Sequence, residues 1–191
     1  MERKHDATGA SLKGRLLVAT PLLGDPNFER AVILLLEHTE EGAVGVVLNR
    51  PSGADFIDPL PDWYGFAAYP PVVFVGGPVS QGSAIGLARV RTPQTTPSFT
   101  PVVAGIGTVD LTLDPEDVGL GVEEVRVFTG YAGWGEGQLE AEIGEGAWWV
   151  VEADQEDALC SDPARLWRSV LRRQTDRLAL FANFPQDAAE N

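Results

Sequence analysis

The segment from Gly130 to Glu142 constrains the fold of this chain more than any other stretch. It follows a β-branched apolar run at residues 125–129, and its first eight residues contain four glycines, one Tyr and one Trp. Glycine is favoured where the backbone needs a positive φ or where another group approaches closely. The segment predicts a strand, then a chain reversal around Tyr131 and Trp134, and then a short helix at residues 137–143.

The order of strand, glycine-rich turn and helix also occurs at phosphate sites, because backbone N–H groups and helix N-termini attract anions. This segment lacks the Gly-x-x-x-x-Gly-Lys-Ser/Thr pattern, has no Lys nearby and carries Glu136, whose charge repels phosphate. The glycines are therefore expected to let Tyr131 and Trp134 pack while the chain reverses. No nucleotide or other cofactor is predicted.

Two continuous apolar runs, residues 32–38 and 43–49, flank Thr39-Glu40-Glu41-Gly42 and predict a β-hairpin buried on both faces. Residues 85–90 are expected to pair with residues 72–75. Other strands are expected at residues 15–20, 102–113, 125–129 and 148–152. Short helices are expected after Asp114-Pro115 and after Asp162-Pro163, where a capping residue precedes Pro.

These elements predict an α+β fold, with a mostly antiparallel sheet curled toward a barrel and a few short helices at its edges. Residues 1–12 carry mixed charge without periodicity and are expected to be a flexible tail. Residues 13–191 then form a single domain. Five prolines exclude one regular element over residues 51–71, where at most a helical turn is expected.

Composition limits the function classes. The 28 acidic and 14 basic residues give a net charge of −14, which opposes binding to nucleic acid. Cys160 is the only cysteine, so no intrachain disulfide is possible and a reducing compartment is favoured. The longest aliphatic run, residues 31–36, is too short to cross a bilayer. The sequence predicts a cytoplasmic protein without a membrane segment.

His38 and His5 are the only histidines, and His38 could act as an acid or base at the end of a predicted strand. Asn49-Arg50-Pro51 closes the same hairpin, so we expect its amide and guanidinium near His38 at one end of the sheet. A structural role in holding the loop is the simpler interpretation of these residues.

On the short helix, Gln138 and Glu142 share a face at i,i+4, whereas Glu140 points away. The glutamates are expected to be solvated. Too few histidines accompany them to predict a metal site.

Other reactive side chains give weaker signals. Ser80 follows Gly76-Gly77-Pro78 but lacks a Gly-x-Ser-x-Gly pattern, so no catalytic triad is assembled. Cys160 is expected to be a buried small residue. Arg165, Arg168 and Arg172 fall at i, i+3 and i+7 of the last helix and form the one candidate stripe for nucleic acid or an acidic partner. Pairing with the chain's own acidic residues explains the stripe more simply.

Three blocks of the sequence, within about residues 13–173, resemble the YqgE/AlgH family of bacterial proteins. The first block is Gly14-Arg15-Leu16-Leu17-Val18-Ala19-Thr20-Pro21 with Phe28 and the hairpin from Glu37-His38 to Asn49-Arg50-Pro51; the second is Gly76-Gly77-Pro78-Val79; the third is Gly130-Tyr131-Ala132-Gly133-Trp134 with Gly137-Gln138-Leu139-Glu140 and Glu142. Trp149 and Trp167 also fit positions that are often aromatic in the family.

The resemblance implies a compact α+β fold, with a bifurcated sheet curled into a pseudo-barrel, and a cytosolic protein of unassigned biochemical activity. A role in transcription is attributed to some members. After the second block, family members often have a strand that ends in Leu-His, whereas this chain reads Leu87-Ala88-Arg89. A mechanism that needs this histidine is not expected here.

The sequence favours a non-enzymatic binding or regulatory protein for a small ligand or a protein partner. The candidate ligand-binding residues are His38, Asn49, Arg50, Gly76, Gly77, Tyr131, Gly133, Trp134, Gly137, Gln138 and Glu140. One alternative is an enzyme that uses His38 with Glu140 or Gln138. A second is a transcription regulator that contacts DNA through Arg165, Arg168 and Arg172. The sequence does not indicate the ligand or the oligomeric state.

Overall fold

The computed structural model describes residues 10–55, 58–175 and 177–184. The strands are β1 (Arg15–Ala19), β2 (Val32–Thr39), β3 (Gly42–Val47), β4 (Pro51–Asp55), β5 (Val72–Val75), β6 (Val79–Val90), β7 (Phe99–Val103), β8 (Ile106–Val109), β9 (Val122–Gly135) and β10 (Trp148–Glu152). The helices are α1 (Gln138–Gly144), α2 (Leu166–Arg172) and α3 (Leu178–Phe181), with 3-10 helices η1 (Pro26–Phe28), η2 (Pro61–Phe66) and η3 (Pro163–Arg165).

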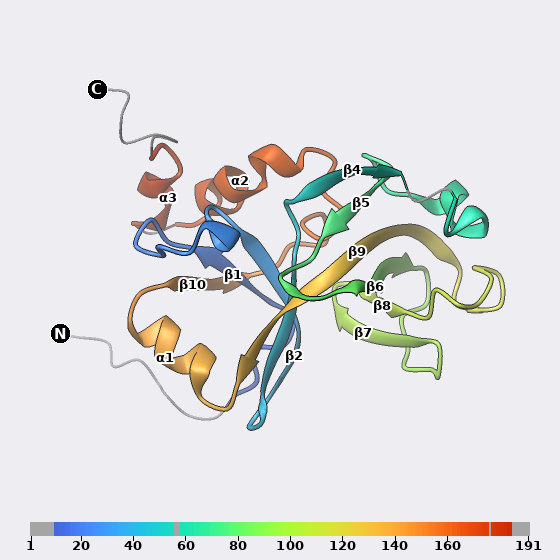
Figure 1. Cartoon of the computed structure of the whole chain (residues 1–191), viewed down its shortest axis with the longest axis horizontal. Coiled ribbons are helices and arrows are strands. Elements are labelled where there is room, and N and C mark those ends of the chain that lie inside the picture. The colour runs from blue at the N-terminus through green and yellow to red at the C-terminus, as the bar shows by residue number, and fades with distance from the viewer. Residues whose placement is uncertain (1–9, 56–57, 176, 185–191) are drawn as a thin grey trace.

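The strands form one sheet in the order β10-β1-β2-β3-β9-β6-β8-β7, and β5 joins it through β9 and carries β4 (Figure 1). The C-terminal end of β9 pairs with β3, whereas its remaining length pairs with β6 and, over Phe128 and Thr129, in parallel with β5. The sheet therefore branches along β9. As predicted, the fold is a mostly antiparallel sheet curled into a half-barrel with a few short helices.

The hairpin of β2 and β3 is confirmed, and the adjacent strands β1 and β2 are buried on both faces. The side chains on one face pack with α2, whereas those on the other face pack with α1. Leu16, Val18 and Leu34 belong to the first set, and Leu17, Ile33 and Leu35 to the second; all six are fully buried. Continuous apolar runs thus form central strands here, because each strand has a packed layer on either side.

The expected chain reversal around Tyr131 and Trp134 is wrong. β9 continues through both residues to Gly135, and the chain turns only before α1. Gly130 has a φ of 68°, and a Cβ on it would collide with the carbonyl oxygens of Gly77 and Val79. Its absence of a side chain allows the connection between β5 and β6 to cross β9 closely. Close backbone approach, rather than a turn, explains the glycine.

Three further expectations differ from the structure. Residues 102–113 are not one strand, because Ala104 and Gly105, both at positive φ, turn the chain between β7 and β8. Residues 85–90 pair with β9 and β8 and not with β5. No helix follows Asp114: the backbone N–H of Asp117 bonds its carbonyl, but Gly119, at a φ of 72°, ends the turn.

The helices at residues 137–143 and after Asp162-Pro163 are confirmed as α1 and as η3 with α2. Of the expected N-terminal tail, residues 1–9, including His5, lie outside the described residues, whereas Ser11 and Leu12 contact His38. Within the described ranges, no helix has the length and apolar character needed to cross a bilayer.

Candidate functional site

The carboxylate of Glu142 fastens α1 to two tryptophans. Its Oε2 accepts hydrogen bonds from the indole N–H groups of Trp134 at 2.9 Å and Trp148 at 2.8 Å. Its Oε1 accepts one from the amide of Gln138 at 3.0 Å, so the predicted i,i+4 face is confirmed. The amide oxygen of Gln138 also accepts from the backbone N–H of Gly135. Glu142 is therefore a structural anchor rather than the solvated side chain that the sequence predicted.

Glu140 points away from Glu142, as predicted, and its Oε1 lies 2.7 Å from Nε2 of His38. The other ring nitrogen, Nδ1, accepts the backbone N–H of Leu12 at 2.9 Å. Because a backbone amide can only donate, Nδ1 carries the lone pair and Nε2 the hydrogen. Both nitrogens of the neutral ring are thus engaged, which leaves His38 no free nitrogen for acid or base chemistry.

The hydrogen bond from its own backbone N–H, followed by the one from His38, lowers the pKa of Glu140 from its ordinary value. The carboxylate is therefore favoured in the folded state. Gly137, the N-cap residue of α1, adopts a φ of 69°, and no side-chain hydrogen bond caps the helix there. These residues together attach α1 and the N-terminal segment to the hairpin.

The glycines of the second block lie at the crossing of the β5–β6 connection with β9. Gly76 donates its N–H to the carbonyl of Thr129, and its own carbonyl accepts the N–H of Val47, both at 2.8 Å. A Cβ on Gly77 would collide with the backbone of Tyr131. Gly133 is exposed beside the ring of Tyr131. A ligand-binding role for these four residues stays a prediction.

Asn49 and Arg50 lie at the opposite end of the hairpin from His38, so the expectation that they are close is wrong. His38 pairs with Ala43 beside the turn, whereas Asn49 accepts the N–H of Val32 at the start of β2. Val32 and His38 are six residues apart along β2, and at about 3.3 Å per residue this places Asn49 roughly 20 Å from His38. The candidate residues from the sequence therefore do not form one cluster.

Asn49 and Arg50 instead hold the segment that leads into β2. The Asn49 amide donates to the carbonyl of Arg30 at 2.9 Å, and the guanidinium of Arg50 donates to the carbonyl of Glu29. Burial lowers the pKa of Arg50, and the charge of Glu29 opposes this effect. Arg30 has a φ of 51°, a conformation that costs a non-glycine residue on the order of 1 kcal/mol. The surrounding hydrogen bonds keep this strained backbone in place.

Beside this segment lies a cavity of about 400 Å³ between the β1–β2 connection, α2 and Phe184, which follows α3. Its wall includes the guanidinium of Arg30, which lies 4.8 Å from the centroid of the Trp167 ring and donates to the carbonyl of Phe184 at 2.7 Å. The Trp167 indole donates to the carbonyl of Ala19 at 2.9 Å. The lining residues are Ala19, Thr20, Pro21, Leu23, Gly24, Asp25, Pro26, Glu29, Arg30, Trp167 and Phe184.

The cavity was not predicted from the sequence, although Asn49 and Arg50, which support its wall, were singled out. Figure 1 shows the dark-blue connection between β1 and β2 beside α3, two segments from opposite ends of the chain. Cavities of about 300–1,000 Å³ with mixed apolar and polar walls commonly bind small ligands. This cavity is therefore a candidate binding site in the described part of the chain.

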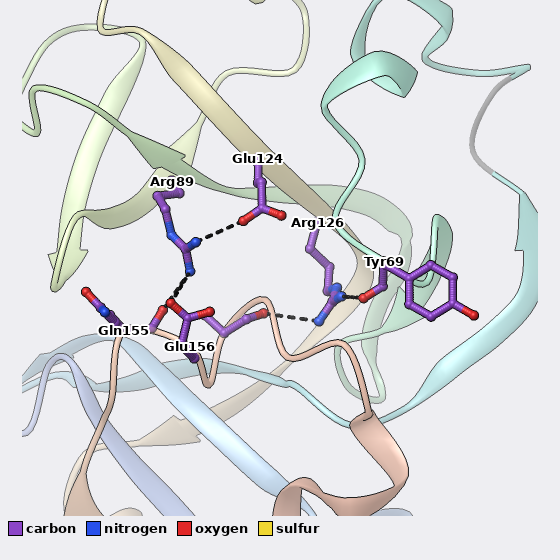
Figure 2. Close-up of polar contacts among 7 residues, drawn as sticks. Tyr69, Arg89, Glu124, Arg126, Gln155 and Glu156 are labelled. Atoms are coloured by element: carbon purple, nitrogen blue, oxygen red, sulfur yellow. Dashed lines mark hydrogen bonds and ion pairs between the residues drawn. The ribbon is translucent and has the colours of Figure 1, made fainter.

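A buried arginine was also missed. Arg126 on β9 is 1% exposed, and its guanidinium donates to the carbonyl of Tyr69 at 2.7 Å (Figure 2). It also donates to the carbonyl of Cys160 at 2.9 Å. It also lies 4.3 Å from the centroid of the Phe74 ring. Burial lowers its pKa to about 10. The signal was available in the sequence, because a charged residue interrupts an apolar run that is otherwise suited to the core.

Arg89 attaches the same loop, between β10 and η3, to the sheet. Its guanidinium bonds the carboxylates of Glu124 at 2.9 Å and Glu156 at 3.3 Å and the carbonyl of Gln155 at 3.0 Å (Figure 2). Cys160 in this loop is half-buried rather than buried, and burial raises the pKa of its thiol. The contacts of both arginines are with the protein itself, so this cluster is structural.

The arginine stripe on α2 is exposed or half-exposed, and it is only partly neutralised. Arg165 lies 3.5 Å from Asp162, an exposed i,i+3 pair that contributes little. Arg168 and Arg172 form no ion pair with any described residue. No group of three or more His, Cys, Asp or Glu side chains suited to a metal occurs among the residues that the structure describes.

The sequence profile described as AlgH-like matches residues 16–179. The chain is 54% identical to a UPF0301 protein of Streptomyces coelicolor over 95% of this chain and 96% of the relative. It is 43% identical to a UPF0301 protein of Mycobacterium tuberculosis over 93% and 90% of the two chains. None of these descriptions states a reaction, a ligand or a partner.

Two solved structures have similar folds. A crystal structure of a Corynebacterium diphtheriae protein gives a TM-score of 0.84 at 32% identity, with 96% of this chain and 95% of that chain covered. The solution structure of the AlgH protein from Pseudomonas aeruginosa gives a TM-score of 0.66 at 29% identity, with 98% and 100% covered. Together with the profile match over most of its length, these likenesses show that the chain belongs to the AlgH-like family.

Proposed function

We propose that this AlgH-like protein is a non-enzymatic binding protein of the cytoplasm, and that it binds its ligand in the cavity beside Arg30 and Trp167. The observation that carries the proposal is that hydrogen bonds within the protein hold both residues in place. Asn49 holds the backbone of Arg30, and the carbonyl of Ala19 holds the Trp167 indole. A wall fixed before the ligand arrives loses little conformational entropy on binding.

The strained backbone of Arg30 supports the same proposal. Positive φ values in non-glycine residues persist only where the surroundings enforce them, and they are enriched at ligand sites. The apolar faces of Trp167, Leu23 and Pro26 supply contact area, whereas Asp25, Glu29 and the guanidinium of Arg30 supply polar groups. A cavity of this kind suits a small organic ligand or one apolar side chain of a partner.

The alternatives have less support. His38, the acid or base of the enzyme hypothesis, uses both ring nitrogens in contacts with Leu12 and Glu140. Contact with DNA through Arg168 and Arg172 is opposed by a net charge of −14. The presence of a single cysteine fits a reducing compartment. The raised pKa of the Cys160 thiol gives no support to a thiol mechanism.

A thermal-shift screen tests the proposal. The panel consists of amino acids, carboxylic acids, nucleosides and small aromatic compounds. A bound compound at about 100 times its Kd is expected to raise the Tm by roughly 5 °C or more. The blocking variant is Gly24→Leu, because Gly24 lines the cavity and an added Cβ meets no atom within 4 Å.

The matched control is Gly82→Leu in the exposed part of β6, where an added Cβ likewise meets no atom within 4 Å. We expect Gly24→Leu to abolish the shift and Gly82→Leu to keep it. A panel without any hit, or hits that survive in Gly24→Leu, would show that the cavity is not the binding site.

A further inference from the structure

Among the residues that the structure describes, the cations without an acidic or carbonyl partner gather in one place. Nine of the twelve described basic side chains bond an acidic side chain or a backbone carbonyl: Lys13, Arg15, Arg30, Arg50, Arg89, Arg91, Arg126, Arg165 and Arg173. Within the described ranges, Arg168, Arg172 and Arg177 have no such partner. All three lie on α2 or at the start of α3, so this surface is basic in a protein that is acidic elsewhere.

Large apolar side chains are exposed on and just beyond α3, which packs against α2. Leu180 on α3 is 76% exposed, and Phe184 just beyond it is 44% exposed. Across the cavity, Leu22 is 82% exposed between the lining residues Pro21 and Leu23. The apolar side chains therefore stand on both sides of the cavity mouth. Neighbouring exposed apolar groups around a concavity mark an interaction surface.

Resting on the proposed binding site, we propose that its natural occupant is an acidic segment of a partner protein. An apolar side chain of this segment enters the cavity between Leu22 and Phe184, and its carboxylates pair with Arg168 and Arg172. These two arginines are one turn apart at i,i+4 and share a face of α2. The net charge of −14 opposes an acidic segment over the protein as a whole, and Arg168 and Arg172 offer it a local attraction that favours one position.

A peptide partner explains more of the surface than a polyanion or a lipid does. DNA would meet the full negative field of the protein and would leave the cavity unfilled. An anionic membrane would contact the exposed Leu180 and the arginines but is too flat to fill a cavity between two segments. Only a segment that carries both carboxylates and an apolar side chain uses the cations, the apolar rim and the cavity together.

The experiment measures fluorescence anisotropy of the full chain with a fluorescein-labelled peptide, Glu-Glu-Leu-Phe-Glu-Asp-Leu-Leu-Glu-Glu. The charge variant combines Arg168→Gln with Arg172→Gln and is expected to raise the Kd about 5- to 30-fold, as expected for two surface charge pairs. Its control is Arg91→Gln, an exposed arginine just after β6 that is expected to leave the Kd within about twofold. Gly24→Leu is expected to remove binding, and Gly82→Leu to preserve it.

The outcomes separate the two proposals. If the peptide does not bind while small compounds still lose their thermal shift in Gly24→Leu, the acidic-segment inference is overturned and the cavity proposal stands. If the peptide binds Gly24→Leu as tightly as wild type, and small compounds also keep their shift, both fail. If a duplex oligonucleotide or phosphatidylglycerol vesicles bind through Arg168 and Arg172 and the peptide does not, the partner is of another class and the inference is wrong.

Discussion

The guanidinium of Arg30 lies over the indole ring of Trp167, with 4.8 Å between its carbon and the ring centroid. This contact joins the connection before β2 to α2, and the bond from Arg30 to the carbonyl of Phe184 extends it to the end of α3. Three segments that are distant in sequence thus meet at one residue with a strained backbone. The cavity wall depends on that residue.

Arg30→Gly and Arg30→Ala should differ in stability although both remove the same side-chain contacts. At a φ of 51°, glycine relieves the backbone strain that alanine retains. We expect Arg30→Gly to be the more stable variant by about 0.5–1 kcal/mol, after allowance for the larger entropy of glycine in the unfolded chain. Urea unfolding of the two variants measures this difference. An Arg30→Ala variant that is as stable or more stable would show that the backbone is unstrained.

Glu142→Ala should destabilise the fold strongly, because it leaves the indole N–H groups of Trp134 and Trp148 without an acceptor. Both rings are buried, so we expect a loss of about 2–4 kcal/mol. Glu145→Ala, at the exposed C-cap of the same helix, is the control and should change stability by less than about 0.5 kcal/mol. Equal losses in urea unfolding would refute the anchor role of Glu142.

The contribution of Glu140 should depend on pH. Its pKa is lowered in the folded state, so its carboxylate stabilises the fold above the ordinary value of 4.5. This contribution is lost as the pH falls through the lowered folded value. The stability difference between wild type and Glu140→Gln should therefore be larger at about pH 6 than at about pH 3. Glu136→Gln, an exposed carboxylate nearby, is the control; a difference for Glu140→Gln that does not change with pH would contradict the prediction.

Arg126→Leu should cost far more stability than Arg89→Leu. The first leaves the part-buried carbonyls of Tyr69 and Cys160 without donors, at about 2–4 kcal/mol. The second removes partly exposed ion pairs to Glu124 and Glu156, at about 1 kcal/mol or less. Urea unfolding measures both. An Arg126→Leu variant as stable as wild type would mean that the desolvation cost of burying the guanidinium, which leucine removes, is as large as the loss of the hydrogen bonds.

The sequence predicted the fold class and those elements that are specified by residues close together in the chain. The hairpin of β2 and β3 has a turn between two apolar runs, and α1 has an i,i+4 pair, Gln138 and Glu142, that makes the expected contact. Pairing across long separations had no such signal, so β6 was assigned to β5 instead of β9. The glycines near Gly130 were interpreted as a turn, because a close crossing with Gly77 depends on the whole sheet.

The candidate site was predicted in part. His38 and Glu140 are in contact, as the enzyme hypothesis required. The second ring nitrogen of His38, however, accepts a hydrogen bond from the backbone of Leu12, and only the fold determines this contact. The sequence predicted Asn49 at the wrong end of the hairpin, although a hairpin that turns at residues 39–42 already brings residue 49 to the start of β2. The cavity is formed by segments from both ends of the chain, and no residue spacing in the sequence predicts that they are in contact.

The most direct test of the binding cavity is the tryptophan indole region of a ¹⁵N–¹H spectrum during titration with the acidic peptide. The Trp167 indole N–H bonds Ala19 in the cavity wall, whereas those of Trp63, Trp134 and Trp148 bond groups elsewhere. We predict that the Trp167 signal shifts as the peptide binds and that the signals of Trp63, Trp134 and Trp148 stay in place. Saturable binding that leaves the Trp167 signal unmoved would contradict the proposed site.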